Sequence, residues 1–184
     1  MAKITFITGG TASGKTRWAV TNFAACDNVL YMAVAGKLDS DTARRVEFNC
    51  KERDVEWDIK LSAENLAEMA RGRKFSILDN LGAYVNRIAA KKCPDISDID
   101  NEIRREIEQQ AIAEITELLT AVRESNGNLI IISTELGYCP LPAEKEARWF
   151  REILGNVNQR IANISNEVYL SASGITFKIK GDGV

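Results

Sequence analysis

The feature that most constrains the fold is an eight-residue stretch near the start of the chain, residues 9–16, with the sequence GGTASGKT. It fits the pattern GxxxxGK[ST] in full, and it lies between an apolar, β-branched run and a segment with helical spacing. Strand, glycine-rich loop and helix in this order are typical of a phosphate-binding loop. Glycines allow backbone N–H groups to approach phosphate oxygens, and the helix N-terminus adds partial positive charge.

The loop therefore predicts a site for a nucleoside triphosphate, ATP or GTP. The residues expected to surround the phosphates are Gly9, Gly10, Thr11, Ala12, Ser13, Gly14, Lys15 and Thr16. We expect the Lys15 ammonium to reach the β- and γ-phosphates and the Thr16 hydroxyl to ligate Mg²⁺. The alternative is a glycine turn that fits the pattern by chance, which the position after a first strand disfavours.

Strands alternate with helices along most of the chain. Apolar runs predict strands at 3–8, 28–35, 74–80 and 129–134. Helical spacing predicts helices at 14–25, 39–53, 62–72, 81–91, 102–125 and 144–165, and the 62–72 segment has a serine at its start and a glycine at its end.

Two further strands, EVYLSAS and ITFKIK, flank Gly174 and predict a closing hairpin. This pattern predicts an α/β fold, with a mostly parallel sheet, helices on both faces and a C-terminal antiparallel strand pair. The length of 184 residues fits one domain spanning 1–184.

Composition narrows the functional class. A net charge of −2 argues against a general nucleic-acid-binding face, and no apolar run is long enough for a membrane span. The N-terminus reads as a strand and not as a leader, and four cysteines without a CxxC pair indicate reduced thiols in a cytoplasmic protein. The sequence contains no histidine, which excludes a Ser-His-Asp triad and any nucleotidyl-histidine intermediate.

Two acidic residues follow predicted strands. Asp79 ends the strand at 74–80, where the acid that supports magnesium belongs, although it could instead cap the next helix. Glu135 follows the strand at 129–134. Because ligands of open α/β sheets bind beyond the carboxyl ends of the strands, Glu135 competes with Asp79 for the metal or orients an acceptor hydroxyl.

Arginines are the remaining candidates for charge stabilisation. Arg148 and Arg151 lie three residues apart in the C-terminal helical segment, and Arg44 and Arg45 lie in the second helical segment. Any of them could neutralise charge on a transferring phosphoryl group, and each could equally be a solvated surface charge.

The long helical segment at 102–125 carries one apolar stripe. Core packing is the favoured interpretation and a subunit interface is the alternative. The stripe consists of Ile103, Ile107, Ala111, Ile115, Leu118, Leu119 and Val122.

Beyond the loop motif, several stretches resemble one known family, the adenosylcobinamide kinase/adenosylcobinamide-phosphate guanylyltransferases. These stretches are the opening ITGGTASGKTRWA, the strand VLYMAVA and, above all, the run from TELG to ITFKIK. The resemblance spans nearly the whole chain and is weakest in the middle. Positions of the C-terminal run that match the family pattern are Glu135, Gly137, Arg148, Phe150, Arg151, Gly155, Asn158, Gln159, Ser173, Gly174 and Lys178.

This resemblance implies a RecA-like P-loop NTPase fold, a trimeric assembly and two reactions of cobalamin biosynthesis. The first reaction phosphorylates the aminopropanol hydroxyl of adenosylcobinamide, a corrinoid, with ATP or GTP. The second transfers GMP from GTP through a guanylylated histidine on the second helix. In both reactions the partners are a nucleoside triphosphate and a corrinoid, and the expected assembly is a homo-oligomer.

The chain departs from the family where the second reaction takes place. Its second helical segment, DSDTARRVEFNCKER, has Phe48 at or next to the position of the guanylylated histidine, with Asn49 beside it. Phosphoryl transfer requires positioning and charge stabilisation but no covalent enzyme intermediate. We therefore expect a Mg²⁺-dependent kinase that retains the first reaction and has lost the second.

Two other hypotheses remain open at this stage. The altered middle region could belong to a kinase that phosphorylates a different small-molecule alcohol. Alternatively, the chain could be a nucleotide-binding regulator without transfer activity, because a fold can persist when its activity is lost.

Overall fold

The fold was analysed in a computed structural model that describes residues 1–34, 40–61, 64–94 and 100–183. One seven-stranded sheet has the order β3-β2-β4-β5-β1-β6-β7. All neighbouring strands run parallel except β6 and β7, which pair antiparallel. The predicted α/β fold, with its mostly parallel sheet and its C-terminal antiparallel pair, is confirmed.

The strands are β1 (Lys3–Gly9), β2 (Val29–Ala33), β3 (Trp57–Lys60), β4 (Phe75–Asp79), β5 (Asn128–Ile132), β6 (Glu167–Ala172) and β7 (Ile175–Lys180). The helices are α1 (Lys15–Asn22), α2 (Ser40–Arg53), α3 (Leu66–Ala70), α4 (Leu81–Lys92), α5 (Asn101–Glu124) and α6 (Lys145–Ile164).

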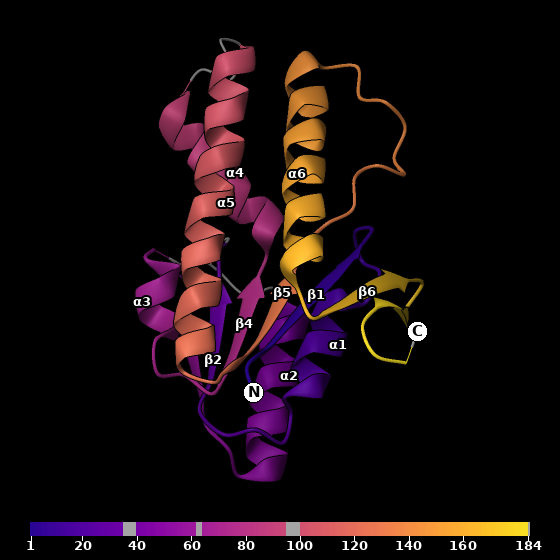
Figure 1. Ribbon diagram of the computed structural model, residues 1–184. Helices are drawn as coiled ribbons and strands as arrows, with labels where there is room; N and C mark the ends of the chain where they lie inside the picture. The colour runs from indigo at the N-terminus through magenta and orange to yellow at the C-terminus, as the bar shows by residue number, and fades with distance from the viewer. Residues whose placement is uncertain (35–39, 62–63, 95–99, 184) are drawn as a thin grey trace.

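Helices cover both faces of the sheet (Figure 1). On one face, α1 and α2 pack against inward residues of the central strands, among them Ile7, Tyr31 and Ile77. On the other face, α3, α4, α5 and α6 enclose a larger core that includes Phe6 and Leu78. Because successive side chains of a strand point to opposite faces, a continuous apolar run supplies both cores.

The apolar stripe of α5 belongs to the larger core. Ile107, Ala111, Ile115, Leu118, Leu119 and Val122 are buried, and Ile103 packs against them. Core packing was therefore the right interpretation of this stripe.

Two expectations need correction. No strand was expected at 57–60, yet β3 forms the edge of the sheet beside β2. It alternates over only four residues, too few for a clear periodic signal. The third helix begins at Leu66 instead of near residue 62, with Asn65 at its N-cap; Ser62, the predicted cap, lies outside the described residues. Gly72 follows the C-cap Arg71 with φ +77°, so the predicted glycine stop is correct.

The strand order indicates that a ligand site lies at the carboxyl edge of the sheet. The chain leaves β1 toward β2 on one side, while β6 lies on the other side of β1, so the strand order reverses at β1. Ligands of open α/β sheets bind outside such a reversal. At this edge α5 and α6 run side by side and extend beyond the strands (Figure 1).

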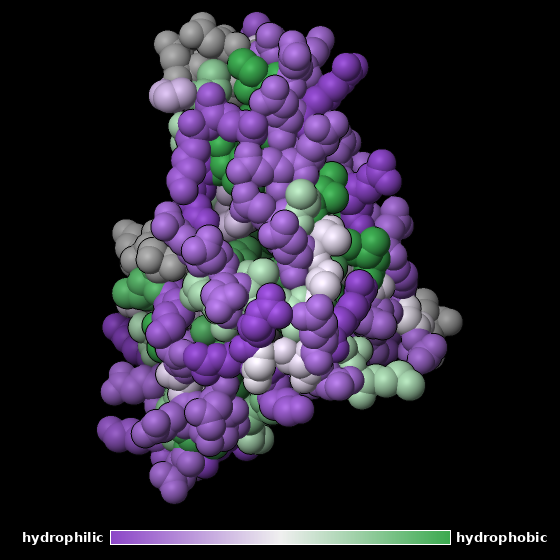
Figure 2. Space-filling model, turned by 60° about the vertical axis from the view of Figure 1, so that its left-hand side comes forward, coloured by the Kyte–Doolittle hydropathy of each residue, from purple (hydrophilic) through white to green (hydrophobic). Residues whose placement is uncertain are grey.

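Figure 2 shows the surface after the left-hand side of Figure 1 is turned forward. This surface is mostly hydrophilic, and its hydrophobic side chains form small separate groups. Across the described ranges, none of the helices has both the length and the apolar character required to cross a membrane.

Candidate functional site

The glycine-rich loop connects β1 to α1 at the reversal point of the sheet. Gly9 has φ +150°, Ala12 φ +57° and Gly14 φ +99°, so the backbone repeatedly enters the region that favours glycine. Residues 11–16 of the loop line a cavity of about 740 Å³ together with Arg17, the start of α2 and the β6–β7 turn. A loop of this shape at a helix N-terminus is suited to binding a phosphate chain.

Lys15 is the buried cation of this loop. Its ammonium donates hydrogen bonds to the carbonyl oxygens of Gly9 at 2.9 Å and Gly10 at 2.6 Å. Burial lowers the pKa of Lys15 from its ordinary value, and the negative charge of Asp79 opposes that shift. The ammonium therefore lies inside the loop, bonded to two backbone carbonyls.

Thr16 and Asp79 come together beneath the loop. The Thr16 hydroxyl donates to Asp79 Oδ2 at 3.0 Å, and the Tyr31 hydroxyl donates to the same oxygen at 2.5 Å. A hydroxyl and a carboxylate are the hard oxygen donors that Mg²⁺ prefers beside phosphate oxygens. The residues present at this position therefore fit a magnesium ion.

The β6–β7 turn supports the loop from the other side. Gly174 N–H donates to the Ser13 carbonyl at 2.9 Å, and the Ser171 hydroxyl donates to the same carbonyl at 2.7 Å. A Cβ on Gly9 would lie 2.1 Å from the Ser171 carbonyl oxygen. The closing hairpin, more than 150 residues away in sequence, therefore fixes the shape of the glycine-rich loop.

Glu135 lies beside the loop, but its carboxylate points elsewhere. Its backbone N–H donates to the Gly9 carbonyl at 2.9 Å, whereas its side chain accepts a hydrogen bond from the Gly137 N–H at 2.6 Å. The structure thus brings Asp79 to Thr16 and leaves the Glu135 carboxylate bound to its own loop.

Asn158 holds the end of β5 in place. This side chain, 6% exposed, accepts a hydrogen bond from the Ser133 hydroxyl at 2.6 Å and donates one to the Thr134 carbonyl at 3.1 Å. Since Glu135 follows directly, Asn158 of α6 determines where the carboxyl end of β5 presents its side chains.

Arg148 and Arg151 bind the loop between β5 and α6. The Arg148 guanidinium donates to the carbonyls of Pro142 and Ala143, and the Arg151 guanidinium donates to that of Gly137 at 2.7 Å. Neither arginine lines the cavity at the glycine-rich loop. In this structure both side chains hold the 135–144 segment against α6.

The second helix contributes its first turn to the cavity. Asp41 and Thr42 line it, while Arg44 is exposed and does not. Phe48 is 63% exposed. The side chains of Arg45 and Asn49 lie outside the described part of the chain.

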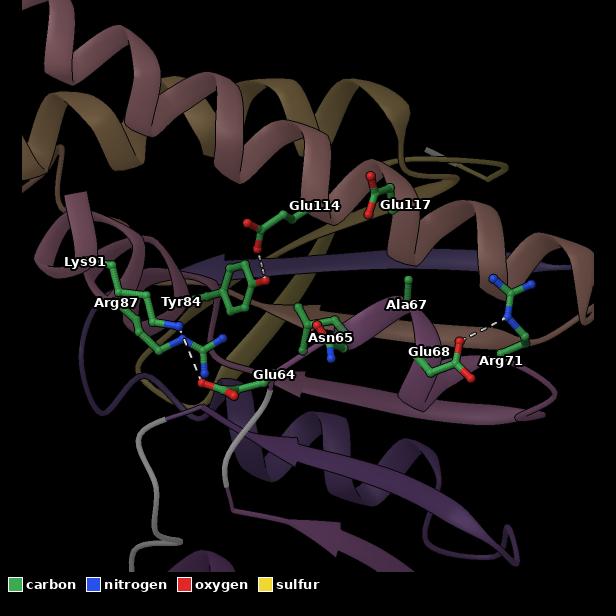
Figure 3. Close-up of a pocket in the computed structure, with 11 residues that line it drawn as sticks. Glu64, Asn65, Ala67, Glu68, Arg71, Tyr84, Arg87, Lys91, Glu114 and Glu117 are labelled. Carbon is green, nitrogen blue, oxygen red and sulfur yellow. Dashed lines mark hydrogen bonds and ion pairs between the residues drawn. The ribbon is translucent and has the colours of Figure 1, made fainter.

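A second charged hollow of about 620 Å³ lies between α3, α4 and α5 (Figure 3). Its charged groups bind one another: Lys91 pairs with Glu64, and the Tyr84 hydroxyl donates to Glu114 (Figure 3). Burial and this hydrogen bond raise the pKa of Tyr84. This hollow contains no residue of the glycine-rich loop.

Several residues of the site were not expected from the sequence, among them Tyr31 and Ser171. Tyr31 lies inside the apolar strand β2, where an aromatic residue is expected in the core, so its bond to Asp79 had no sequence signal. The role of Ser171 was also missed, because a serine in a closing strand is not distinctive before its contact with Ser13 is known.

Comparison with known proteins gives a consistent result. A model of the family described as cobinamide kinase / cobinamide phosphate guanyltransferase matches residues 5–179. The chain is 32% identical over 178 residues to the bifunctional adenosylcobalamin biosynthesis protein CobU of Escherichia coli K12, covering 95% of this chain and 98% of the relative. It is 29% identical to the protein of the same name from Salmonella typhimurium LT2, with 95% and 98% covered. Against CobP of Pseudomonas aeruginosa the identity is 27%, with 96% of each chain covered.

Proposed function

The chain belongs to the cobinamide kinase / cobinamide phosphate guanyltransferase family of cobalamin biosynthesis, and from this premise we propose that it is a kinase of adenosylcobinamide. The proposed reaction transfers the γ-phosphoryl group of ATP or GTP to the hydroxyl of the aminopropanol arm. The P–O bond to the β-phosphate breaks, a bond to the acceptor oxygen forms, and the nucleoside diphosphate leaves.

One observation carries this proposal: the Thr16 hydroxyl and the Asp79 carboxylate meet beneath a complete phosphate loop. Phosphoryl transfer depends almost entirely on positioning and charge stabilisation, and these residues supply both. When bound, Mg²⁺ would neutralise charge on the β- and γ-phosphates. Thr16 and Asp79 would hold that ion, and the loop N–H groups would orient the triphosphate.

Other residues have supporting roles in the proposal. Lys15 would exchange its bonds to the loop carbonyls for bonds to the β- and γ-phosphates. Glu135 follows β5, and its backbone N–H is bonded to the Gly9 carbonyl, so it lies beside the loop. It would orient the acceptor hydroxyl and receive its proton once its carboxylate releases the Gly137 N–H. Arg148 and Arg151 would stabilise developing charge only after releasing the carbonyls that they bind, which makes them weaker candidates.

We also propose that the guanylyl-transfer reaction has been lost. The sequence has no histidine, and Phe48 stands at or next to the matching position on α2, with its side chain exposed. A covalent guanylyl intermediate requires a nucleophile, and phenylalanine has none.

The test is a product assay by mass spectrometry with adenosylcobinamide, MgATP and MgGTP present together. Adenosylcobinamide phosphate as the sole product, with no guanylylated protein, is the expected result. A GDP-linked product would contradict the loss of the second reaction. Unchanged adenosylcobinamide would contradict the proposed kinase, and a panel of other alcohols would then separate a different acceptor from a non-catalytic nucleotide binder.

We further propose that copies of the chain associate, as the resemblance to a trimeric family implies. The edge strand β7 exposes three apolar side chains on one face, Ile175, Phe177 and Ile179, each more than half exposed. Apolar side chains on an exposed sheet edge favour pairing with another chain. Sedimentation of the purified protein tests this association, because it measures the mass of the assembly. A cytoplasmic location is a separate prediction.

A further inference from the structure

A further cavity lies at the carboxyl edge of the sheet, on the other side of Asp79 from α1 and α2. It has a volume of about 370 Å³, and it lies between the start of α4, the end of β5 and the middle of α6. The residues that line it are Asn80, Gly82, Ala83, Asn86, Thr134, Leu136, Phe150 and Leu154. Within the described part of the chain, it shares no lining residue with the cavity at the glycine-rich loop.

The position of this cavity is fixed by the phosphoryl-transfer site itself. Asn80 follows Asp79 directly, and Thr134 precedes Glu135. Asn80 Oδ1 accepts a hydrogen bond from the Ala83 N–H at 2.8 Å, and the Thr134 carbonyl is held by Asn158. Both walls of the cavity are thus anchored to the two strand ends that carry the candidate acids.

Phosphoryl transfer requires the acceptor oxygen and the leaving oxygen to lie roughly in line through the phosphorus. The loop cavity extends toward α2 and the β6–β7 turn, so the nucleoside part of a bound nucleotide would lie on that side. The acceptor must then approach the γ-phosphate from the opposite side of the loop. The cavity between α4 and α6 occupies that side.

The lining defines the chemistry of the occupant. Four members are apolar side chains, Ala83, Leu136, Phe150 and Leu154, while Asn80, Asn86 and Thr134 carry neutral hydrogen-bonding groups. No residue of the lining carries a charge. Such a surface suits a neutral ligand that combines apolar parts with hydrogen-bonding groups and disfavours an anionic or cationic acceptor.

We propose that this cavity binds the alcohol-bearing arm of the acceptor and the neutral hydrogen-bonding groups next to it. The inference rests on the proposed kinase function and assigns the acceptor site to α4, β5 and α6. A volume of about 370 Å³ holds an arm and not a whole corrin ring, so the ring lies outside the cavity mouth. Phe150, which matches the family pattern between two arginines, then contacts the acceptor.

The test uses a substitution that fills the cavity and changes no residue at the nucleotide site. Ala83 is half-buried in the cavity wall on α4, and Ala90 is exposed on the same helix outside the cavity. A83L should raise the KM for adenosylcobinamide by about tenfold or more, whereas A90L should leave it unchanged. The dissociation constant for MgATP should stay within about twofold in A83L.

A second variant covers the case in which A83L fails to fold. Asn86 is exposed, so N86A should fold, and the loss of one neutral hydrogen bond should raise the acceptor KM by about fivefold with little change in kcat. If the unmodified protein phosphorylates adenosylcobinamide and all variants keep its acceptor KM, the cavity assignment is wrong and the kinase proposal stands. If the unmodified protein phosphorylates nothing, the kinase proposal fails and the cavity assignment fails with it.

Discussion

The Thr16 hydroxyl and the Asp79 carboxylate lie 3.0 Å apart, although 63 residues separate them in the sequence. Parallel pairing places β4 beside β5 and β5 beside β1, so the strand that ends in Asp79 and the strand that leads to the loop share one edge. The proposed magnesium site is therefore a product of sheet order.

Replacing the carboxylate of this pair tests its role directly. D79N should lower the rate of phosphoryl transfer by about 100-fold or more and should raise the Mg²⁺ concentration needed for half-maximal rate, because an amide is a poor magnesium ligand. Steady-state assays over a range of Mg²⁺ concentrations measure both effects. D182N, the same change at an exposed position near the C-terminus, is the matched control and should behave like the unmodified protein.

Two neighbouring glycines of the loop should respond differently to alanine. A Cβ on Gly9 would meet the Ser171 carbonyl oxygen at 2.1 Å in a backbone conformation that disfavours side chains, so G9A should lower the free energy of unfolding by about 2–4 kcal/mol. No heavy atom lies within 4 Å of a Cβ on Gly10. G10A should therefore cost less than about 1 kcal/mol in urea unfolding, and equal losses in the two variants would contradict the proposed contact.

The buried amide of Asn158 should matter for the stability of the protein. N158A leaves the Ser133 hydroxyl and the Thr134 carbonyl without this partner and should lower the free energy of unfolding by about 1–3 kcal/mol. N156A on the same helix removes only an exposed bond to Glu108 and should cost about 0.5 kcal/mol or less. Urea unfolding of both variants measures the difference, and a loss in N156A as large as in N158A would contradict this explanation.

The lowered pKa of Glu167 predicts that the protein loses stability in acid. Burial by itself would raise the pKa of Glu167, but hydrogen bonds from Lys3, Lys178 and Tyr169 outweigh that effect and lower its pKa to about 2. A group with a depressed pKa in the folded state stabilises the protein above its ordinary value of 4.5, and this contribution is lost as pH falls from there toward 2.

The size of this effect is limited because Lys3 is 49% exposed and its ion pair is partly screened. We expect the free energy of unfolding to fall by about 1–2 kcal/mol between about pH 6 and pH 3 through Glu167. E167Q should lose that part of the pH dependence, as urea unfolding at the two pH values would show. An unchanged pH profile in E167Q would contradict the assignment.

The sequence by itself was enough to predict the phosphate loop, the alternation of strands and helices and the C-terminal hairpin. Each of these rests on local patterns: glycines at fixed spacing, apolar periodicity and a turn residue between two β-branched runs. The strand β3 lacked such a pattern because it has only four residues at the edge of the sheet. The predicted start of α3 was wrong because a serine cap pattern does not by itself determine at which residue the helix begins.

Only the tertiary structure decided which side chains share the site. The sequence favoured Asp79 for the metal and left Glu135 as a competitor. Strand pairing placed Asp79 against Thr16, while a local turn bound Glu135 to Gly137. Likewise, the prediction that Arg148 and Arg151 lie on α6 was correct. The direction of their side chains, however, depends on the 135–144 loop, which folds back on the helix. Local patterns follow from neighbours in the chain, whereas the contacts of a long side chain depend on segments that only the folded sheet brings together.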